Sequence, residues 1–264
     1  MLGKLMKYEF MATGRVFLPL FAALLIVSVI NRIFQSLELQ VPSVLGIILS
    51  VVLIVGICVL TLIITLQRFR NNLLSNEGYL MMTLPVSTNS LILSKLFVAA
   101  IWTVVSFVVV VASVMIMAMS GIDLQDIVIS ARLFFNNILA ETTLESTHLV
   151  VFSIEAVVCI ILSVLSGILF LYACMSLSML VNKRRWLFTF GAYVVISTAL
   201  QILFSVLVAI GAAAGITEVF DFSAWNTFGL SQMIILIFLV IEAALCVAYY
   251  YVTRYMLKRR LNLL

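Results

Sequence analysis

The chain has 264 residues, of which 65% are hydrophobic and 10% are charged, and its mean hydropathy is +1.29. A composition this apolar excludes an ordinary soluble globular protein and indicates a polytopic membrane protein. The net charge of +4 does not indicate a nucleic-acid partner, because in a membrane protein the positions of basic residues matter more than their sum.

The first predicted element covers residues 1–15. Its apolar residues recur at helical spacing, whereas Lys4, Lys7 and Glu9 lie off this stripe. Such a pattern is typical of an amphipathic helix lying on a membrane surface. We therefore expect a cytoplasmic surface helix that leads into the first membrane span. Its apolar stripe consists of Leu2, Leu5, Met6 and Phe10.

Six long apolar runs follow this helix. A helix that crosses about 30 Å of hydrocarbon needs roughly 20 residues. The runs that satisfy this length lie near 16–36, 43–66, 97–119, 149–181, 187–214 and 230–252. The fourth run is longer than a span requires, so it should tilt strongly or project into the cytoplasm. We expect an all-α fold with six transmembrane helices in one membrane domain over 1–264.

The basic residues predict the orientation, because cytoplasmic loops carry an excess of Lys and Arg. With the N-terminus inside, thirteen of the 15 basic residues are cytoplasmic, and Arg32 and Arg132 are external. The chain is thus predicted to be a multi-pass protein of the cell membrane with both termini in the cytoplasm. The internal residues are Lys4, Lys7, Arg15, Arg68, Arg70, Lys95, Lys183, Arg184, Arg185, Arg254, Lys258, Arg259 and Arg260.

Two external segments separate the spans. Residues 121–148 keep apolar residues at helical spacing opposite polar ones, which indicates a helix at the lipid headgroups. This helix is either a lid or a short surface element that closes the connection. Residues 217–229 alternate polar and aromatic residues, and they indicate an interfacial loop.

The predicted cytoplasmic segment 76–85 interrupts the apolar runs. Ser75 or Asn76 can cap a short helix, Glu77 lies in its favourable first turn, and Pro85 stops it. Its apolar residues Leu80, Met81 and Leu84 leave Glu77, Tyr79 and Thr83 on the other side. The segment is either a docking site for a protein or a solvated turn.

Two carboxyl groups and a pair of glycines lie in or beside the apolar runs. Glu242 lies near the middle of the sixth run, and Glu155 lies about two turns into the fourth. A charge at mid-membrane costs at least about 2.5 to 3.5 kcal/mol, so such residues usually face a bundle interior or a cavity. Each is either a neutral carboxyl bonded to a neighbouring helix or, above all for Glu242, a group that lines a transport path or subunit seam. Gly211 and Gly215 form a GxxxG set that suits a dimer seam or close packing within the chain.

The sequence offers no catalytic machinery of its own. It contains no GxxxxGK phosphate-binding loop and no nucleophile–base constellation, so we predict no catalytic residue and no enzyme. The single histidine, His148, and four cysteines without paired spacing predict neither a metal site nor a disulfide framework. Any energy source must therefore lie in another chain. The cysteines are Cys58, Cys159, Cys174 and Cys246.

Two motifs resemble a known family. Glu77-Gly78-Tyr79-Leu80 followed by Thr83-Leu84-Pro85, between the second and third spans, resembles the coupling-helix region of bacterial permease subunits of type-2 ABC exporters. The opening Lys7-Tyr8-Glu9-Phe10 with Thr13-Gly14-Arg15 resembles the start of such subunits. The resemblance implies that Glu77, Gly78, Tyr79, Leu80, Thr83 and Pro85 dock into a separate ATPase subunit.

The resemblance also implies the partners and the cargo. The chain would form a homodimer or heterodimer with a second membrane subunit and would bind two ATPase subunits, which hold ATP and magnesium. ATP-driven closure would move 76–85 and tilt the first, second and fifth spans. The implied cargo is an amphipathic or antimicrobial peptide such as a phenol-soluble modulin, with lipids or drugs next.

Two other functions fit the sequence. One is a proton-coupled secondary transporter in which Glu242 carries the proton. The other is a membrane scaffold or immunity protein that transports nothing. A neighbouring reading frame with a nucleotide-binding loop would favour the exporter.

Overall fold

The computed structural model of the chain describes residues 2–37, 39–71, 88–118, 129, 133, 146–181, 185–213 and 227–259. These residues form six long helices and one turn of 3₁₀ helix. The long helices are α1 (Leu2–Ser36), α2 (Gln40–Phe69), α4 (Thr88–Ala118), α6 (Ser146–Leu177), α7 (Arg185–Ala213) and α9 (Thr227–Arg259), and the short turn is η2 (Ser178–Leu180).

Each of the six long helices in the described residues is long and apolar enough to cross a membrane. The prediction of an all-α fold with six helices able to span a membrane is therefore confirmed, and six such helices indicate a multi-pass membrane protein. The orientation of the termini stays a prediction. The apolar segments are Leu5–Ser36, Gln40–Phe69, Asn89–Ala118, Val151–Leu180, Trp186–Ile210 and Gln232–Lys258.

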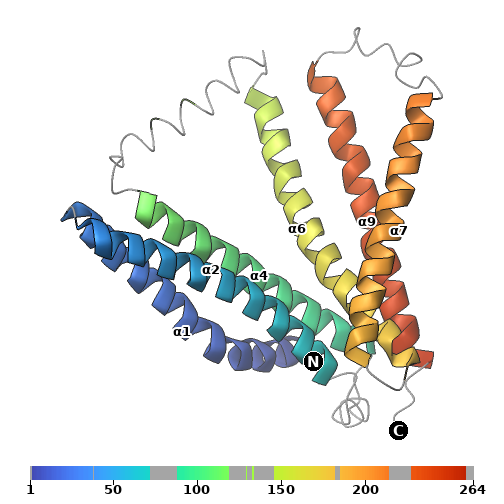
Figure 1. Ribbon diagram of the computed structural model, residues 1–264. Coiled ribbons are helices and arrows are strands. Elements are labelled where there is room, and N and C mark those ends of the chain that lie inside the picture. Colours follow the sequence, from blue (N-terminus) through green and yellow to red (C-terminus); the bar gives the residue numbers. More distant parts are fainter. Residues whose placement is uncertain are drawn as a thin grey trace. The chain divides into compact units, whose positions relative to one another are not determined.

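Helix α1 runs through the boundary that the sequence suggested between a surface helix and the first span. It is continuous from Leu2 to Ser36 and contains Pro19. Figure 1 shows that α1 changes direction toward its N-terminal end. Proline bends a helix because it removes one hydrogen bond of the helical ladder and its ring crowds the preceding turn. The chain thus redirects its first segment without ending the helix.

The chain divides into two compact units, residues 1–137 and 138–264, and each is described by itself. In the first unit, α1, α2 and α4 contact one another. Its core takes residues from all three helices, and Trp102 stacks on Phe10 and Phe17 with ring centroids 4.7 and 5.1 Å apart. The buried core residues are Phe17, Phe21, Leu24, Ile57, Val98 and Trp102.

Helices α1 and α2 come very close at Gly46. A Cβ atom at this position would lie 2.4 Å from the Oδ1 atom of Asn31, so any side chain here would require Asn31 or the helix backbone to shift. Asn31 itself is buried, at 1% exposure. Gly46 therefore allows a close approach that alanine would prevent.

In the second unit, α6 packs against α9 and α7. The buried residues of α6 lie near its C-terminal end and include Ile168, Leu169, Tyr172 and Cys174. Helix α7 has no buried residue in its apolar segment Trp186–Ile210. Most of the side chains in this segment are exposed within the second unit.

Serine and threonine residues fit into these apolar helices by bonding to their own backbone. The hydroxyls of Ser28, Ser50, Thr61 and Thr253 donate to the carbonyl four residues earlier, at 2.7 to 2.8 Å. A hydroxyl bonded in this way is satisfied without water, as a membrane interior requires. These four hydroxyls therefore need no partner helix to be tolerated here.

Candidate functional site

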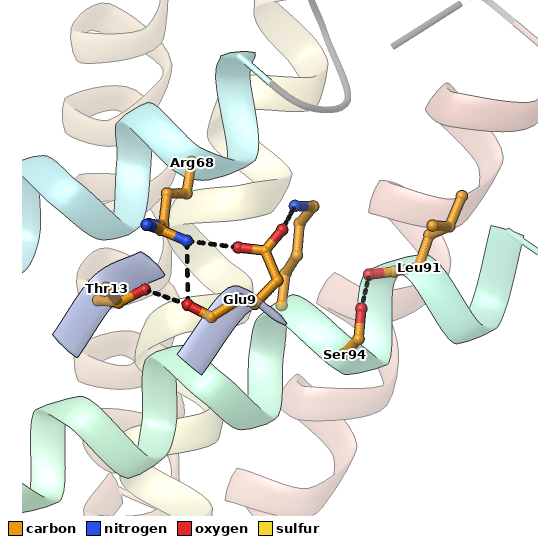
Figure 2. Close-up of polar contacts among 6 residues, drawn as sticks. Glu9, Thr13, Arg68, Leu91 and Ser94 are labelled. Atoms are coloured by element: carbon orange, nitrogen blue, oxygen red, sulfur yellow. Dashed lines mark hydrogen bonds and ion pairs between the residues drawn. The ribbon is translucent and has the colours of Figure 1, made fainter. Parts of the chain in front are cut away.

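Among the described residues of the first unit, Glu9, Arg68 and Lys95 form a connected polar site, which we call the Glu9 cluster. One carboxylate oxygen of Glu9 in α1 accepts from the Nη1 atom of Arg68 in α2, at 2.6 Å. The other accepts from the Nζ atom of Lys95 in α4, also at 2.6 Å. One side chain thus connects all three helices of the unit, as Figure 2 shows for Glu9 and Arg68.

The backbone of Glu9 takes part in the same site. Its carbonyl oxygen accepts from the Thr13 hydroxyl at 2.7 Å and from Arg68 Nη1 at 3.2 Å. Arg68 therefore contacts both the side chain and the main chain of Glu9 (Figure 2). Because these bonds are directional, they determine how the end of α2 lies against this turn of α1.

Burial makes the Glu9 cluster electrostatically important. The Lys95 side chain is 3% exposed, that of Glu9 is 13% exposed, and that of Arg68 is 27% exposed. A buried ammonium group that lacks a counter-ion is very unfavourable, because it loses its hydration. Glu9 supplies that counter-ion, and two cations with one carboxylate leave a formal charge of +1.

The Glu9 cluster lies where the chain enters and leaves residues 72–87. Arg68 is in the last turn of α2, and Lys95 is about two turns into α4. Sequence reasoning treated both residues as orientation signals and Glu9 as part of a polar helix face, so it missed their contact. The available signal was that three charged residues flank apolar runs at ends that the predicted topology brings together.

Many of the predicted site residues lie outside the described residues. This applies to all six coupling positions, Glu77, Gly78, Tyr79, Leu80, Thr83 and Pro85, and to Gly215. It also applies to nearly all of 121–148 and to most of 217–229. The backbone of Gly211 belongs to α7, near its C-terminal end.

The two carboxyl residues of the apolar runs both bond across α6 and α9. The Ser166 hydroxyl of α6 donates to the Glu242 carboxyl of α9, at 2.7 Å. The Gln232 side-chain amide of α9 donates to the Glu155 carboxyl of α6. These contacts agree with the interpretation of each residue as a carboxyl bonded to a neighbouring helix, while a role in transport stays a hypothesis.

An aromatic group lies one turn beyond Ser166 on α6. Phe170 packs against Tyr193 of α7 and Tyr249 of α9, with ring centroids 5.3 and 5.2 Å apart. These three rings join the helices of the second unit, and along α9 Tyr249 lies two turns, or about 10 Å, beyond Glu242. Ser166 and Phe170 thus place a polar contact and an apolar contact along one face of α6.

The part of the chain that the structure describes contains no cluster of metal-binding side chains. Those residues contain no group of three or more His, Cys, Asp or Glu side chains that could hold a metal ion. The four cysteines are free thiols.

Comparison of the chain with protein-family models, with curated proteins and with solved structures found no match.

Proposed function

We propose that the chain is the membrane-spanning permease subunit of an ATP-driven exporter of the type-2 ABC class. The observation that carries this proposal is the Glu9 cluster, which connects the N-terminal part of α1 to both helices that flank residues 72–87. A segment that receives force from an ATPase needs such a firm attachment at its two ends. The six apolar helices supply the membrane domain.

In this proposal, residues 76–85 dock on a separate ATPase at the cytoplasmic face. Glu77 and Tyr79 would supply the polar and aromatic contacts of the docking surface. Two ATPase subunits would hold ATP and magnesium, and a second membrane subunit would complete the transport path. The exposed apolar surface of α7 leaves room for such a subunit or for lipid.

The proposed cargo is an amphipathic peptide, and the proposed direction is outward. This choice comes from the resemblance of the Glu77 to Pro85 motif and of the first residues to bacterial exporter subunits. An amphipathic peptide partitions into the bilayer, so it would reach the spans from the membrane side. Lipids and drugs share this property and are the next candidates.

Purification of the full-length protein from its native membranes in mild detergent tests the proposal. We expect an ATPase to co-purify, and we expect the Glu77→Ala/Tyr79→Ala variant to insert normally but to retain little of that ATPase. Lys7→Gln is the control, because Lys7 is an exposed charge on α1. Normal ATPase binding and normal export by the double variant would rule out the docking role.

A second candidate function is proton-coupled transport through Glu242. Its support is the bond between Glu242 and Ser166, which places an ionisable group at a contact between two membrane helices. The exporter proposal is preferred because a carboxyl bonded to a neighbouring helix is also an ordinary packing device.

A further inference from the structure

Two members of the Glu9 cluster, Arg68 and Lys95, belong to the two helices that flank residues 72–87. Residues 72–87 join α2 to α4, with Arg68 in the last turn of α2 and Lys95 about two turns into α4. A displacement of 72–87 would pass to Arg68 and Lys95 through these flanking helix ends. Both of them bond to a single residue of α1.

Lys95 lies in a buried stretch of α4. Its sequence neighbours Leu91, Ile92, Ser94 and Leu96 are also buried, as is Phe69, which follows Arg68 in α2. Water cannot easily replace the Glu9 carboxylate at such a position, so separation of α1 from α4 would leave a cation without its counter-ion. The helix ends should therefore move together rather than slide.

The rest of the interface is different in kind. Beyond the Glu9 cluster, α1 meets α4 through Phe17, Phe21, Leu24, Val98 and Trp102. Apolar packing of this sort is not directional, so small shifts between such surfaces change its energy little. Two bonds at 2.6 Å to one carboxylate do have a direction, and they hold one relative position of the helices.

We propose that the Glu9 cluster transmits movement of residues 72–87 to α1. With the carboxylate in place, the N-terminal part of α1 moves as one body with the adjoining ends of α2 and α4. Without the carboxylate, this part of α1 moves separately. This inference rests on the proposed function only in taking an ATPase as the source of the movement. The mechanical connection between the helices does not depend on that function.

The mechanical connection is tested on the full-length protein in lipid nanodiscs, without a partner. Spin labels are placed on exposed positions of α1 and α4 after replacement of the four native cysteines. A near pair at Met11 and Phe97 reports on the Glu9 cluster, and a distant pair at Ile26 and Val108 reports on the remainder of the interface. All four positions are exposed.

Three variants are compared with the parent protein: Glu9→Gln, Glu9→Gln/Lys95→Met and the control Lys7→Gln. We expect both Glu9 variants to broaden the near-pair distance distribution and to leave the distant pair unchanged. The double variant removes the unpaired buried cation, so it should regain thermal stability while its near pair stays broad. A merely structural role would restore both properties together.

Two results would overturn the inference. One is an unchanged near pair in both Glu9 variants, and the other is an equal broadening of both pairs, which would indicate a general loss of folding. If an ATPase co-purifies, the reconstituted Glu9→Gln/Lys95→Met variant should still hydrolyse ATP but should lose export. The Lys7→Gln control should both hydrolyse ATP and export the cargo. Normal export by the double variant would also overturn the inference.

If no ATPase co-purifies, the proposed function fails. The spin-label result still decides whether the mechanical connection exists.

Discussion

Lys95 is a buried cation paired with the Glu9 carboxylate. Its side chain is 3% exposed, and the Glu9 carboxylate lies 2.6 Å from its ammonium group. A cation that loses such a partner inside a protein is typically destabilising by about 3 to 5 kcal/mol, whereas removal of both charges is often close to neutral. The two charges should therefore be coupled in stability measurements.

Glu9→Gln should lower the free energy of unfolding substantially, and Glu9→Gln/Lys95→Met should recover much of that loss. The physical reason is that methionine fills the space of lysine without a charge. Thermal unfolding of the purified protein in detergent measures both effects, with Lys7→Gln as the control. Equal effects of the single and the double substitution would show that Lys95 does not need the carboxylate.

Glu242→Gln should leave ATP-dependent export largely intact. The amide keeps the shape of a protonated carboxyl, and its oxygen can still accept the hydrogen bond that Ser166 donates. Export from cells or vesicles is measured before and after the proton gradient is collapsed at constant ATP. Neither the Glu242→Gln substitution nor the collapse of the gradient should stop export. Loss of transport in a variant that assembles and hydrolyses ATP normally would support the proton carrier instead.

Some residues of the site were predictable from sequence and others were not. Glu155 and Glu242 stand out because each interrupts an apolar run, and the energetic penalty of a buried charge is a local property. Glu9, Arg68 and Lys95 lie at polar ends of such runs, where charges are common. Their contact joins residues 59 and 86 positions apart, so it depends on how three helices are rotated and packed.

At the scale of elements, one glycine allows α1 and α2 to approach closely near Asn31. Gly46→Ala should force Asn31 or the helices to shift, because the new methyl group would lie 2.4 Å from Oδ1 of Asn31. Overpacking of this kind is destabilising by about 1 to 3 kcal/mol. Thermal unfolding in detergent measures the loss.

Gly56→Ala in the same helix is the matched control. A Cβ atom there would meet nothing within 4 Å, so this substitution should be neutral or stabilising by up to about 1 kcal/mol through helix propensity. Asn31→Ala/Gly46→Ala should recover part of the loss because the opposing oxygen is removed. Equal stability of the two single glycine variants would contradict the close approach.

The helices themselves were predictable, but their ends were not. The apolar run near 43–66 became α2 from Gln40 to Phe69, and the run near 97–119 became α4 from Thr88 to Ala118. A hydropathy pattern reports the length that suits hydrocarbon, whereas a helix continues as long as its backbone bonds are better satisfied than those of a loop. Long basic side chains at the ends can then reach the headgroups.

At the scale of the whole molecule, the excess of basic residues in alternate loops predicts one orientation. Cysteines introduced at Asn76 and Asn182 should resist an impermeant thiol reagent added outside intact cells, and a cysteine at Gln125 should react. The native cysteines are replaced first, and permeabilised cells provide the control for reactivity. Labelling of position 76 from outside would contradict the predicted orientation of the whole chain. It would also contradict the docking of 76–85 on a cytoplasmic ATPase.

Sequence patterns reached the class of fold but not the assembly of each unit. An all-α chain with six spans follows from composition and run length, because every backbone group in lipid must be bonded within the chain. The packing of α1 between α2 and α4 does not follow, since it depends on Gly46 opposite Asn31 and on Trp102 opposite Phe10 and Phe17.

The wide sequence separation within the Glu9 cluster has a consequence for biosynthesis. Glu9 leaves the ribosome 86 residues before Lys95, which corresponds to roughly 4 to 17 seconds at ordinary rates of synthesis. During that interval the Glu9 carboxylate can pair with Arg68, which follows it by 59 residues, but the cluster stays incomplete until the third long helix, α4, supplies Lys95. We expect nascent chains arrested after α2 to leave the N-terminus open to protease, and chains arrested well beyond α4 to protect it.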